Sequence, residues 1–214
     1  MGLFPKAIGE YLSVAGIPRG PLSKVYIVDP TNGSDSNPGT TFQAPLKSVA
    51  AAYAKCAANR NDVVLFVPGP TADNPTAAMV WAKDFTHLVG LGLPLPGMGQ
   101  RCRVVNHADN DLAVLFTLSG SGCIVKNIQF YDGKDKAEDG AAVLVSGSRN
   151  SFENVFVAGM GHATPAARAG SYSLKVTGSE NFFKDCTVGL DTVIRAAANS
   201  ELVVAGARNA FQHC

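Results

Sequence analysis

The sequence predicts an all-β fold, a parallel β-solenoid, from two repeating features of its second half. A glycine recurs at matched places, Gly120, Gly147, Gly178 and Gly206, at spacings of 27, 31 and 28 residues. Apolar residues alternate on both sides of each glycine, which is the period of a strand with one buried face. A repeat of this length indicates one supersecondary unit stacked on the next. We therefore expect two short strands in each unit, with the glycine at the corner between them.

The shared offsets predict which side chains point into the core. Two residues before the glycine lie Leu118, Val145, Val176 and Val204, and four residues before it lie Phe116, Val143, Leu174 and Leu202. Five residues after the glycine lie Val125, Phe152, Phe183 and Phe211, and eight residues after it lie Ile128, Val155, Cys186 and Cys214. The phenylalanines alternate with Glu153, Lys184 and Gln212, so we expect the rings inside; a sugar-binding aromatic row outside is the alternative. Cys186 and Cys214 are within disulfide range or remain buried thiols, and synthesis in a reducing compartment favours thiols.

The segments before these repeats follow a different pattern. Residues 1–24 are predicted to form an arm, because they contain three prolines and four glycines without a sustained period. Residues 25–69 are predicted to form a strand, a long turn, a short amphipathic helix over about 48–58 with Ser48 as N-cap, and a buried strand. Residues 70–214 form the rungs of the solenoid, the first ones degenerate. The helix would cover the exposed strand edges at the start of the stack.

Composition narrows the possible functions. The chain has 214 residues, a formal net charge of +1 and 16% charged residues, which indicates one domain and no nucleic-acid partner. No apolar run approaches the ~20 residues that span a bilayer, and the N-terminus lacks the pattern of a signal peptide. The five cysteines have no metal-ligand spacing. We therefore expect no membrane partner, no metal and no cofactor.

The segment VYIVDPTNGSDSNPGTTFQAPLKSVAAAYAKCAANRNDVVLFVPG resembles the opening of pectate-lyase-like right-handed β-helix proteins. The repeats IVKNIQF, SFENVFV and FFKDCTV resemble that family's bend, where stacked Asn side chains form a ladder. Asn127, Asn154 and Asp185 occupy the ladder position, and His213 replaces them in the last copy. The resemblance covers residues 25–214 and implies a single-stranded right-handed parallel β-helix with a short N-terminal capping helix. We interpret the ladder as structural, since short amides bond the backbone at tight bends.

A second resemblance predicts the function. The segment GLDTVIRAAANSELVVAGARNAFQHC resembles one common in tailed-phage structural proteins with β-helix domains. Together with the apolar arm, it predicts a non-enzymatic structural protein of the bacteriophage virion that decorates or stabilises the capsid or forms part of a fibre. The arm would attach the protein to other virion or capsid proteins. The stacked loops would face other copies, other shell proteins or the host surface, including its polysaccharide. A bacterial surface adhesin is a further possibility, against which the missing signal peptide argues.

The alternative is a polysaccharide-active enzyme, such as a tail-spike depolymerase or a pectate-type lyase. Its catalytic groups would come from the loops that follow each second strand. Two of Asp132, Asp135, Glu138 and Asp139 would supply a carboxylate pair, although these residues could instead bind calcium, and Arg168 and Arg195 would act as a lyase base or as substrate clamps. The opposing interpretation is a solvated charged loop, because Lys134 and Lys136 are interspersed and only one of these loops is acidic.

The turn after the first predicted strand is a candidate calcium site. The segment DPTNGSDSNPG supplies oxygen ligands from Asp29, Asn32, Asp35 and Asn37, but it lacks the spacing of a calcium loop, so turn formation is the favoured interpretation.

The last repeat is incomplete. It ends at Cys214 and so lacks the apolar position that Phe130, Val157 and Val188 fill in earlier copies. We expect further chain or a neighbouring subunit to cover this edge, and a homotrimer is the predicted assembly.

Overall fold

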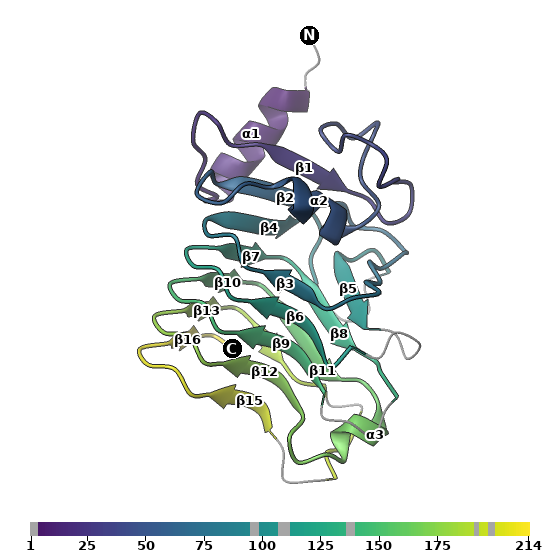
Figure 1. Cartoon of the computed structure of the whole chain (residues 1–214), viewed down its shortest axis with the longest axis vertical. Coiled ribbons are helices and arrows are strands. Elements are labelled where there is room, and N and C mark those ends of the chain that lie inside the picture. The colour runs from purple at the N-terminus through teal and green to yellow at the C-terminus, as the bar shows by residue number, and fades with distance from the viewer. Residues whose placement is uncertain (1–3, 95–98, 107–111, 136–139, 191–192, 197–199) are drawn as a thin grey trace.

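The computed structural model describes residues 4–94, 99–106, 112–135, 140–190, 193–196 and 200–214. Its strands stack in a column, with the N-terminal helix at one end (Figure 1). The first sheet has the order β1-β2-β4-β7-β10-β13-β16. Its members are β1 (Val25–Val28), β2 (Asp62–Phe66), β4 (Thr86–Gly90), β7 (Ile124–Lys126), β10 (Ser151–Glu153), β13 (Phe182–Lys184) and β16 (Ala210–Gln212).

Two further sheets complete the column. One has the order β14-β11-β8-β5, made of β5 (Arg103–Asn106), β8 (Gln129–Asp132), β11 (Phe156–Met160) and β14 (Thr187–Val188). The other has the order β15-β12-β9-β6-β3, made of β3 (Met79–Trp81), β6 (Val114–Leu118), β9 (Ala141–Val145), β12 (Tyr172–Val176) and β15 (Ser200–Val204).

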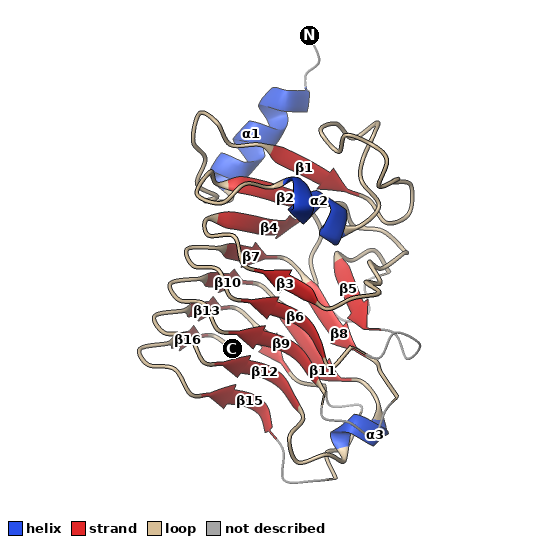
Figure 2. Cartoon of the chain, in the orientation of Figure 1, coloured by secondary structure: helices blue, strands red, loops and turns tan. Residues whose placement is uncertain are grey.

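Each strand pairs in parallel with a strand one turn of the chain away, and helices are few (Figure 2). The predicted parallel β-helix is therefore confirmed.

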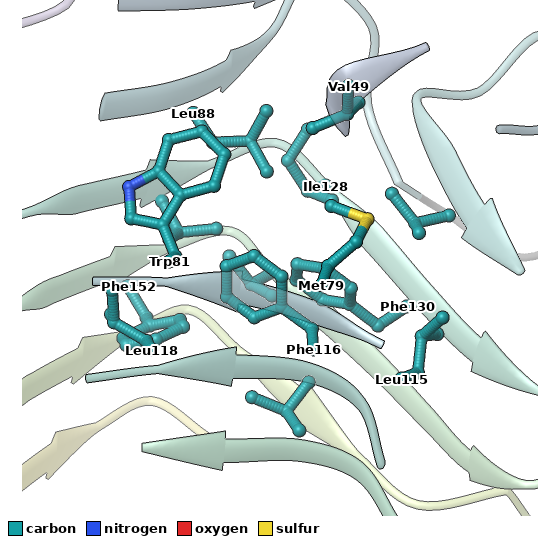
Figure 3. Close-up of a cluster of buried hydrophobic side chains, with 14 of the residues drawn as sticks. Val49, Met79, Trp81, Leu88, Leu115, Phe116, Leu118, Ile128, Phe130 and Phe152 are labelled. Carbon is teal, nitrogen blue, oxygen red and sulfur yellow. The ribbon is translucent and has the colours of Figure 1, made fainter. Parts of the chain in front are cut away.

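The core follows the predicted register. Phe183 pairs with Phe152 on the preceding rung, and Val176 pairs with Val145. Phe152 and Phe183 are each about 1% exposed, and their ring centroids are 4.8 Å apart. The rings lie inside the column, so the alternative of an outward aromatic row is wrong for both. Nearer the first rungs, large side chains from all three sheets fill the core, among them Leu88, Trp81 and Phe130 (Figure 3).

The corner glycines are required by the closeness of successive rungs. A Cβ atom added at Gly178 would lie 1.8 Å from the carbonyl oxygen of Gly147, and one added at Gly147 would lie 1.9 Å from that of Gly120. No side chain fits at such a distance. The repeat therefore keeps glycine wherever one corner stacks directly on the next.

The ladder predicted at the second bend forms as two pairs of bonded side chains. Asn127, Asn154, Asp185 and His213 all adopt positive φ angles of 50–57°, a conformation that asparagine and aspartate tolerate better than most residues. Asn154 Nδ2 donates to Asn127 Oδ1 at 2.7 Å, and His213 Nδ1 lies 3.2 Å from Asp185 Oδ1. His213 thus continues the ladder in the last rung.

A second asparagine ladder, which was not predicted, lies at the glycine corner. Asn150, Asn181 and Asn209 each donate through Nδ2 to the carbonyl oxygen of a corner glycine, at 2.9–3.1 Å. Asn150 N–H also donates to Asn181 Oδ1, and Asn181 N–H to Asn209 Oδ1. These amides satisfy backbone groups that the tight corner would otherwise leave unpaired.

The N-terminal segment forms a helix rather than an irregular arm. Helix α1 (Phe4–Val14) leads into a turn, and Leu12 and Ile17 pack with Val63, Leu65 and Val89 on the outer face of the seven-stranded sheet. At least these apolar residues of segment 1–24 are buried by the chain itself. The role of the segment in attachment remains a prediction. Among the described residues, no helix has the length and hydropathy needed to cross a membrane.

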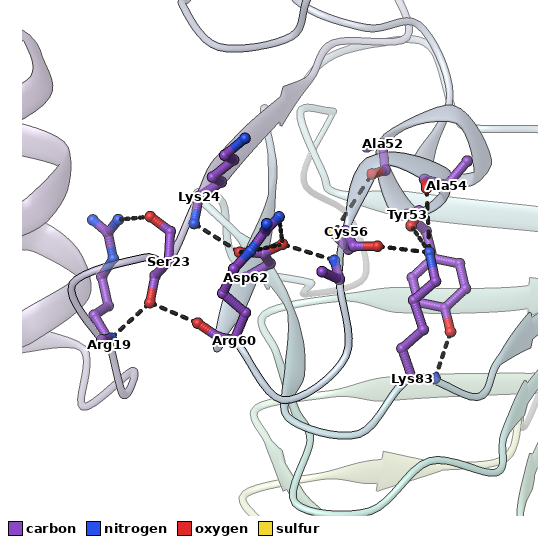
Figure 4. A network of polar contacts seen from close by, with 12 residues as sticks. Arg19, Ser23, Lys24, Ala52, Tyr53, Ala54, Cys56, Arg60, Asp62 and Lys83 are labelled. Carbon is purple, nitrogen blue, oxygen red and sulfur yellow. Dashed lines mark hydrogen bonds and ion pairs between the residues drawn. The ribbon is translucent and has the colours of Figure 1, made fainter.

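Helix α2 (Val49–Lys55) forms within the predicted range and is shorter than expected. Its buried residues Val49 and Ala52 pack on the core, whereas the edge of β1 is paired by the backbone of Gly39 and Leu46 and not by the helix. Ser48 is its N-cap and accepts a hydrogen bond from Ala51 N–H. The loop after the helix is fixed by Asp62, whose buried carboxylate accepts hydrogen bonds from Lys24 N–H, Ala57 N–H and the Arg60 guanidinium (Figure 4). Burial raises the pKa of Asp62, but these donors outweigh it and hold the pKa below its usual value.

The last rung leaves apolar residues exposed. Leu202 is 38% exposed, Val204 is 47% exposed and Phe211 is 36% exposed, although their counterparts in the preceding rungs are buried. Cys186 and Cys214 are free thiols. The thiol interpretation expected both to be buried, but Cys214 is exposed because no further described rung covers it.

Candidate binding cleft

A cleft of about 640 Å³ lies beside the start of α2. Its walls come from the turn after β1, from the first turn of α2 and from residues 71–81, which lead into β3. The side chains that matter for its chemistry are Asp35, Lys47, Ser48, Thr71, Asp73 and Thr76. The cleft therefore combines segments that are well separated in the sequence and lie outside the regular repeats.

Asp35 has both carboxylate oxygens engaged by the protein. Its Oδ1 accepts hydrogen bonds from Lys47 N–H and Ser48 N–H, each at 2.9 Å, and its Oδ2 accepts one from Ser48 Oγ at 2.9 Å. The carboxylate thus fixes the residues that start α2, and its negative charge remains at the wall of the cleft.

The carboxylate of Asp73 differs from that of Asp35 in its burial and in its hydrogen bonds. The backbone of Asp73 pairs with β5, donating to Arg103 O at 2.9 Å and accepting from Val105 N–H at 2.8 Å. The residue is only 5% exposed, and Oδ2 accepts a hydrogen bond from Val49 N–H at 3.1 Å. Oδ1 makes no hydrogen bond to the described residues, although the side chain lines the cleft. One oxygen of a buried carboxylate is therefore available to a ligand.

The pKa of the Asp73 carboxyl is raised, mainly because the group is buried. Burial raises the pKa of the carboxyl to about 6, and the nearby charge of Asp35 raises it further, whereas the bond from Val49 N–H acts in the opposite direction. At pH 7 the group is ionised in a site that solvates the charge poorly. Such a carboxylate favours any ligand that donates a hydrogen bond to it.

Contacts within the chain hold the aromatic wall of the cleft. The Tyr53 ring stacks on Trp81 with centroids 4.1 Å apart, and its hydroxyl accepts hydrogen bonds from Ala82 N–H and Lys83 N–H at 2.6 and 2.7 Å. Lys83 Nζ donates to the carbonyl oxygens of Tyr53 and Cys56 at 2.9 and 2.8 Å (Figure 4). Burial raises the pKa of Tyr53. These contacts hold the wall in place without a ligand.

The catalytic candidates predicted from the sequence take part in separate polar contacts. Asp132 is fully buried, and its Oδ1 accepts a hydrogen bond from Asn106 Nδ2 at 2.8 Å. Asp135 is exposed and accepts one from Thr164 Oγ1 at 2.8 Å, with His162 Nδ1 at 3.1 Å.

The other candidates lie elsewhere or outside the described residues. Arg195 donates to Glu201 Oε1 at 2.6 Å and to Ser173 Oγ at 3.0 Å, and Ser173 also bonds Glu201. These contacts outweigh the burial that raises the pKa of Glu201 and leave it lowered. Arg168 is exposed in the turn after the short helix α3 (Ala163–Ala166). Glu138 and Asp139 lie outside the described residues.

The two calcium candidates have the contacts of turn residues. Asp29 Oδ1 accepts hydrogen bonds from Thr31 N–H and Asn32 N–H, at 2.9 and 3.1 Å, and Asn32 Nδ2 donates to Asp29 Oδ2. Asp35 holds the start of α2, as described above. Among the described residues, no group of three or more potential metal-ligating side chains is present.

Asp73 was not predicted as a site residue. In the sequence it lies in the polar run TADNPT, which is typical of a loop, and it shares no offset with the repeats. Its importance depends on the pairing with β5 and on the position of α2, which only the folded chain shows.

Comparison with known proteins supports the fold. No protein-family model matches the chain, and no curated protein does. Among solved structures, a rhamnogalacturonan lyase matches with a TM-score of 0.59 and 18% identity, over 89% of this chain and 50% of that one. A pectin methylesterase bound to a hexasaccharide matches with a TM-score of 0.53 and 17% identity, over 77% and 49%. Pectin methylesterase PemA from Erwinia chrysanthemi matches with a TM-score of 0.52 and 18% identity, over 78% and 50%.

The likeness is one of fold. At these identities it shows that the chain has the parallel β-helix architecture of pectin-active proteins, in agreement with the pectate-lyase-like resemblance of the sequence. The chain spans about half the length of the structures that it matches.

Proposed function

We propose that this β-helix binds a polysaccharide and that the cleft beside α2 is its saccharide site. The proposal rests above all on Asp73, a buried carboxylate with one oxygen left for a donor in a cleft of about 640 Å³. That volume is typical of small-molecule sites, which combine a preformed shape with a few well-placed polar groups. The fold shared with a rhamnogalacturonan lyase and two pectin methylesterases favours a saccharide as the ligand.

The chemistry of the cleft suits a hydroxyl-rich ligand. Saccharide hydroxyls donate hydrogen bonds, and a carboxylate acceptor forms stronger bonds than a neutral one. Because Asp35, Tyr53 and Lys83 hold the walls in position, the ligand would meet a preorganised site. Preorganisation reduces the entropy lost on binding.

Calorimetric titration with a panel of oligosaccharides tests this proposal. Ala50→Trp, on the exposed face of α2 that lines the cleft, should abolish binding because the indole obstructs the cleft beside α2. Ala58→Trp is the matched control, since Ala58 is exposed beyond the end of α2 and does not line the cleft. Equal affinity of the two variants, or binding of no saccharide by the unmodified protein, would contradict the proposal.

Catalysis and the virion role remain predictions. Among the structures reported above there is no virion protein, so they favour the polysaccharide alternative over the structural virion role. Cleavage of pectic or capsular polysaccharide by the protein would establish an enzyme, with Asp135 and Arg195 as the first residues to substitute. An image that locates the protein on a phage particle would establish the virion role instead.

A further inference from the structure

We infer that the cleft selects uncharged sugar residues, with Asp73 Oδ1 accepting a ligand hydroxyl, and that it rejects free uronates. The inference rests on the proposed saccharide site and specifies the class of ligand. It depends on which carboxylate oxygens of the cleft are occupied and on the balance of charge along its walls.

The two carboxylates of the cleft have different roles. Asp35 Oδ1 accepts two hydrogen bonds and Oδ2 accepts one at the start of α2, and the residue is exposed. Water therefore competes for the remaining acceptor site of Asp35, which contributes mainly its charge. Asp73 Oδ2 is engaged by Val49 N–H, and Oδ1 is not engaged within the described chain. A ligand hydroxyl that donates to Oδ1 would complete the set of hydrogen bonds around a nearly buried charge, which is a strong type of interaction.

The charge of the walls disfavours an anionic ligand. The ionisable residues of the lining are Asp35, Lys47, Tyr53 and Asp73, and Lys47 is the cation among them, on an exposed side chain. A free uronate would bring a third carboxylate next to Asp35 and Asp73, where burial already makes one negative charge unfavourable. An uncharged ring, including a uronate whose carboxyl is esterified, avoids this repulsion while it keeps its hydroxyl donors.

One pair of ligands tests the effect of the ligand's negative charge separately from that of its sugar backbone. Methyl-esterified oligogalacturonide and the same oligosaccharide after saponification share a backbone and differ in the ionisation of the carboxyl groups. Calorimetry at pH 7.5 should show at least about tenfold tighter binding of the esterified form. A neutral hexose oligosaccharide, measured in parallel, shows whether uncharged sugars in general are accepted.

The role of Asp73 is tested with the esterified ligand. Asp73→Asn should weaken binding about tenfold or more, because one acceptor oxygen becomes an amide donor or the bond from Val49 N–H is lost. Asp185→Asn is the control, since it removes the same charge from an exposed carboxylate at the second bend. Thermal unfolding of each variant confirms that it is folded.

The outcomes separate this inference from the function on which it rests. Equal or tighter binding of the saponified oligosaccharide, or unchanged affinity in Asp73→Asn, would overturn the inference and leave a saccharide site in place. Loss of binding in Ala50→Trp together with a clear preference for the esterified ligand supports both. If neither pectic form nor the neutral sugar binds, the proposed function fails and the inference fails with it.

Discussion

Two buried titratable residues should make the stability of this protein respond to pH in opposite directions. His87 is fully buried; its Nδ1 accepts a hydrogen bond from Ile124 N–H at 3.1 Å, and its Nε2 lies 3.2 Å from Asn61 Oδ1. These contacts suit a neutral ring with the proton on Nε2, and burial lowers the pKa of His87 to about 4. Asp73 is an acid whose pKa is raised to about 6.

Asp73→Asn should raise the free energy of unfolding at pH 7.5, by up to about 3 kcal/mol. The carboxyl ordinarily titrates near 3.8 and in the folded chain near 6. Its contribution to stability is therefore complete below pH 3.8 and is lost as the pH rises through 6. Urea denaturation of both proteins at pH 4 and pH 7.5 measures the effect. A difference between the proteins that does not change with pH would contradict it.

The corresponding test for His87 is His87→Gln, in which an amide can keep an acceptor and a donor. The ring ordinarily titrates near 6.5 and in the folded chain near 4. Its contribution to stability is complete above pH 6.5 and is lost as the pH falls towards 4, by about 3 kcal/mol in total. Between pH 7.5 and pH 4.5 the unmodified protein should thus lose more stability than the variant, as measured by urea denaturation. Parallel losses would show that another group is responsible.

At the scale of the rung, the sequence predicted what repeats and missed what does not. The shared offsets identified the buried strand positions and the ladder of Asn127 and Asn154, because parallel stacking places equal offsets side by side. The corner ladder was visible as an asparagine three residues after Gly147, Gly178 and Gly206, but the first copy has Cys123 there. Helix α1 was missed because its stability depends on packing against the outer sheet face.

Phe183→Ala should lower the free energy of unfolding by about 3–5 kcal/mol, since it removes a buried ring and leaves a cavity between two rungs. The ring lies between Phe152 and Phe211, with centroids 4.8 and 4.6 Å away. Phe211→Ala is the matched comparison, and its cost should be clearly smaller because that ring is 36% exposed. Equal losses in chemical denaturation would mean that the two rings are equally buried in solution.

At the scale of the whole molecule, the candidate site could not be predicted, because it lies where the repeats are absent. The cleft joins the turn after β1, α2 and residues 71–81, and no periodicity relates these segments. The loops that sequence reasoning favoured do not form one site among their described residues, because Asp135 bonds to Thr164 and Arg195 bonds to Glu201. Proximity in a solenoid follows from equal offsets, whereas a site built from irregular segments depends on the complete fold.

We propose, as the sequence predicted, that the protein associates as a homotrimer. Leu202, Val204 and Phe211 form an exposed apolar surface on the last described rung, next to strands β15 and β16, which each pair with one described neighbour only. Such a surface is covered either by further chain or by a neighbouring subunit, as the sequence predicted, and burial by a subunit favours association. Light scattering on the 214-residue chain should show a species larger than the monomer. Val204→Lys should shift it towards the monomer, and a monodisperse monomer of the unmodified chain would contradict the proposal.

The connections that follow the second strand of each rung determine where the sequence of this protein can vary in length. They span residues 133–140, 161–171 and 189–199, whereas a Cβ atom added at Gly147, Gly178 or Gly206 would lie less than 2 Å from the carbonyl oxygen of the preceding corner glycine. Lys134, Ala166 and Ser171 within these connections are buried and belong to the fold. Insertions that keep these buried residues should leave the strand pairings of the other rungs in place, so a foreign loop can be grafted at the exposed positions of the connections. The connections can therefore vary in sequence and length, whereas the stacked corners must keep glycine.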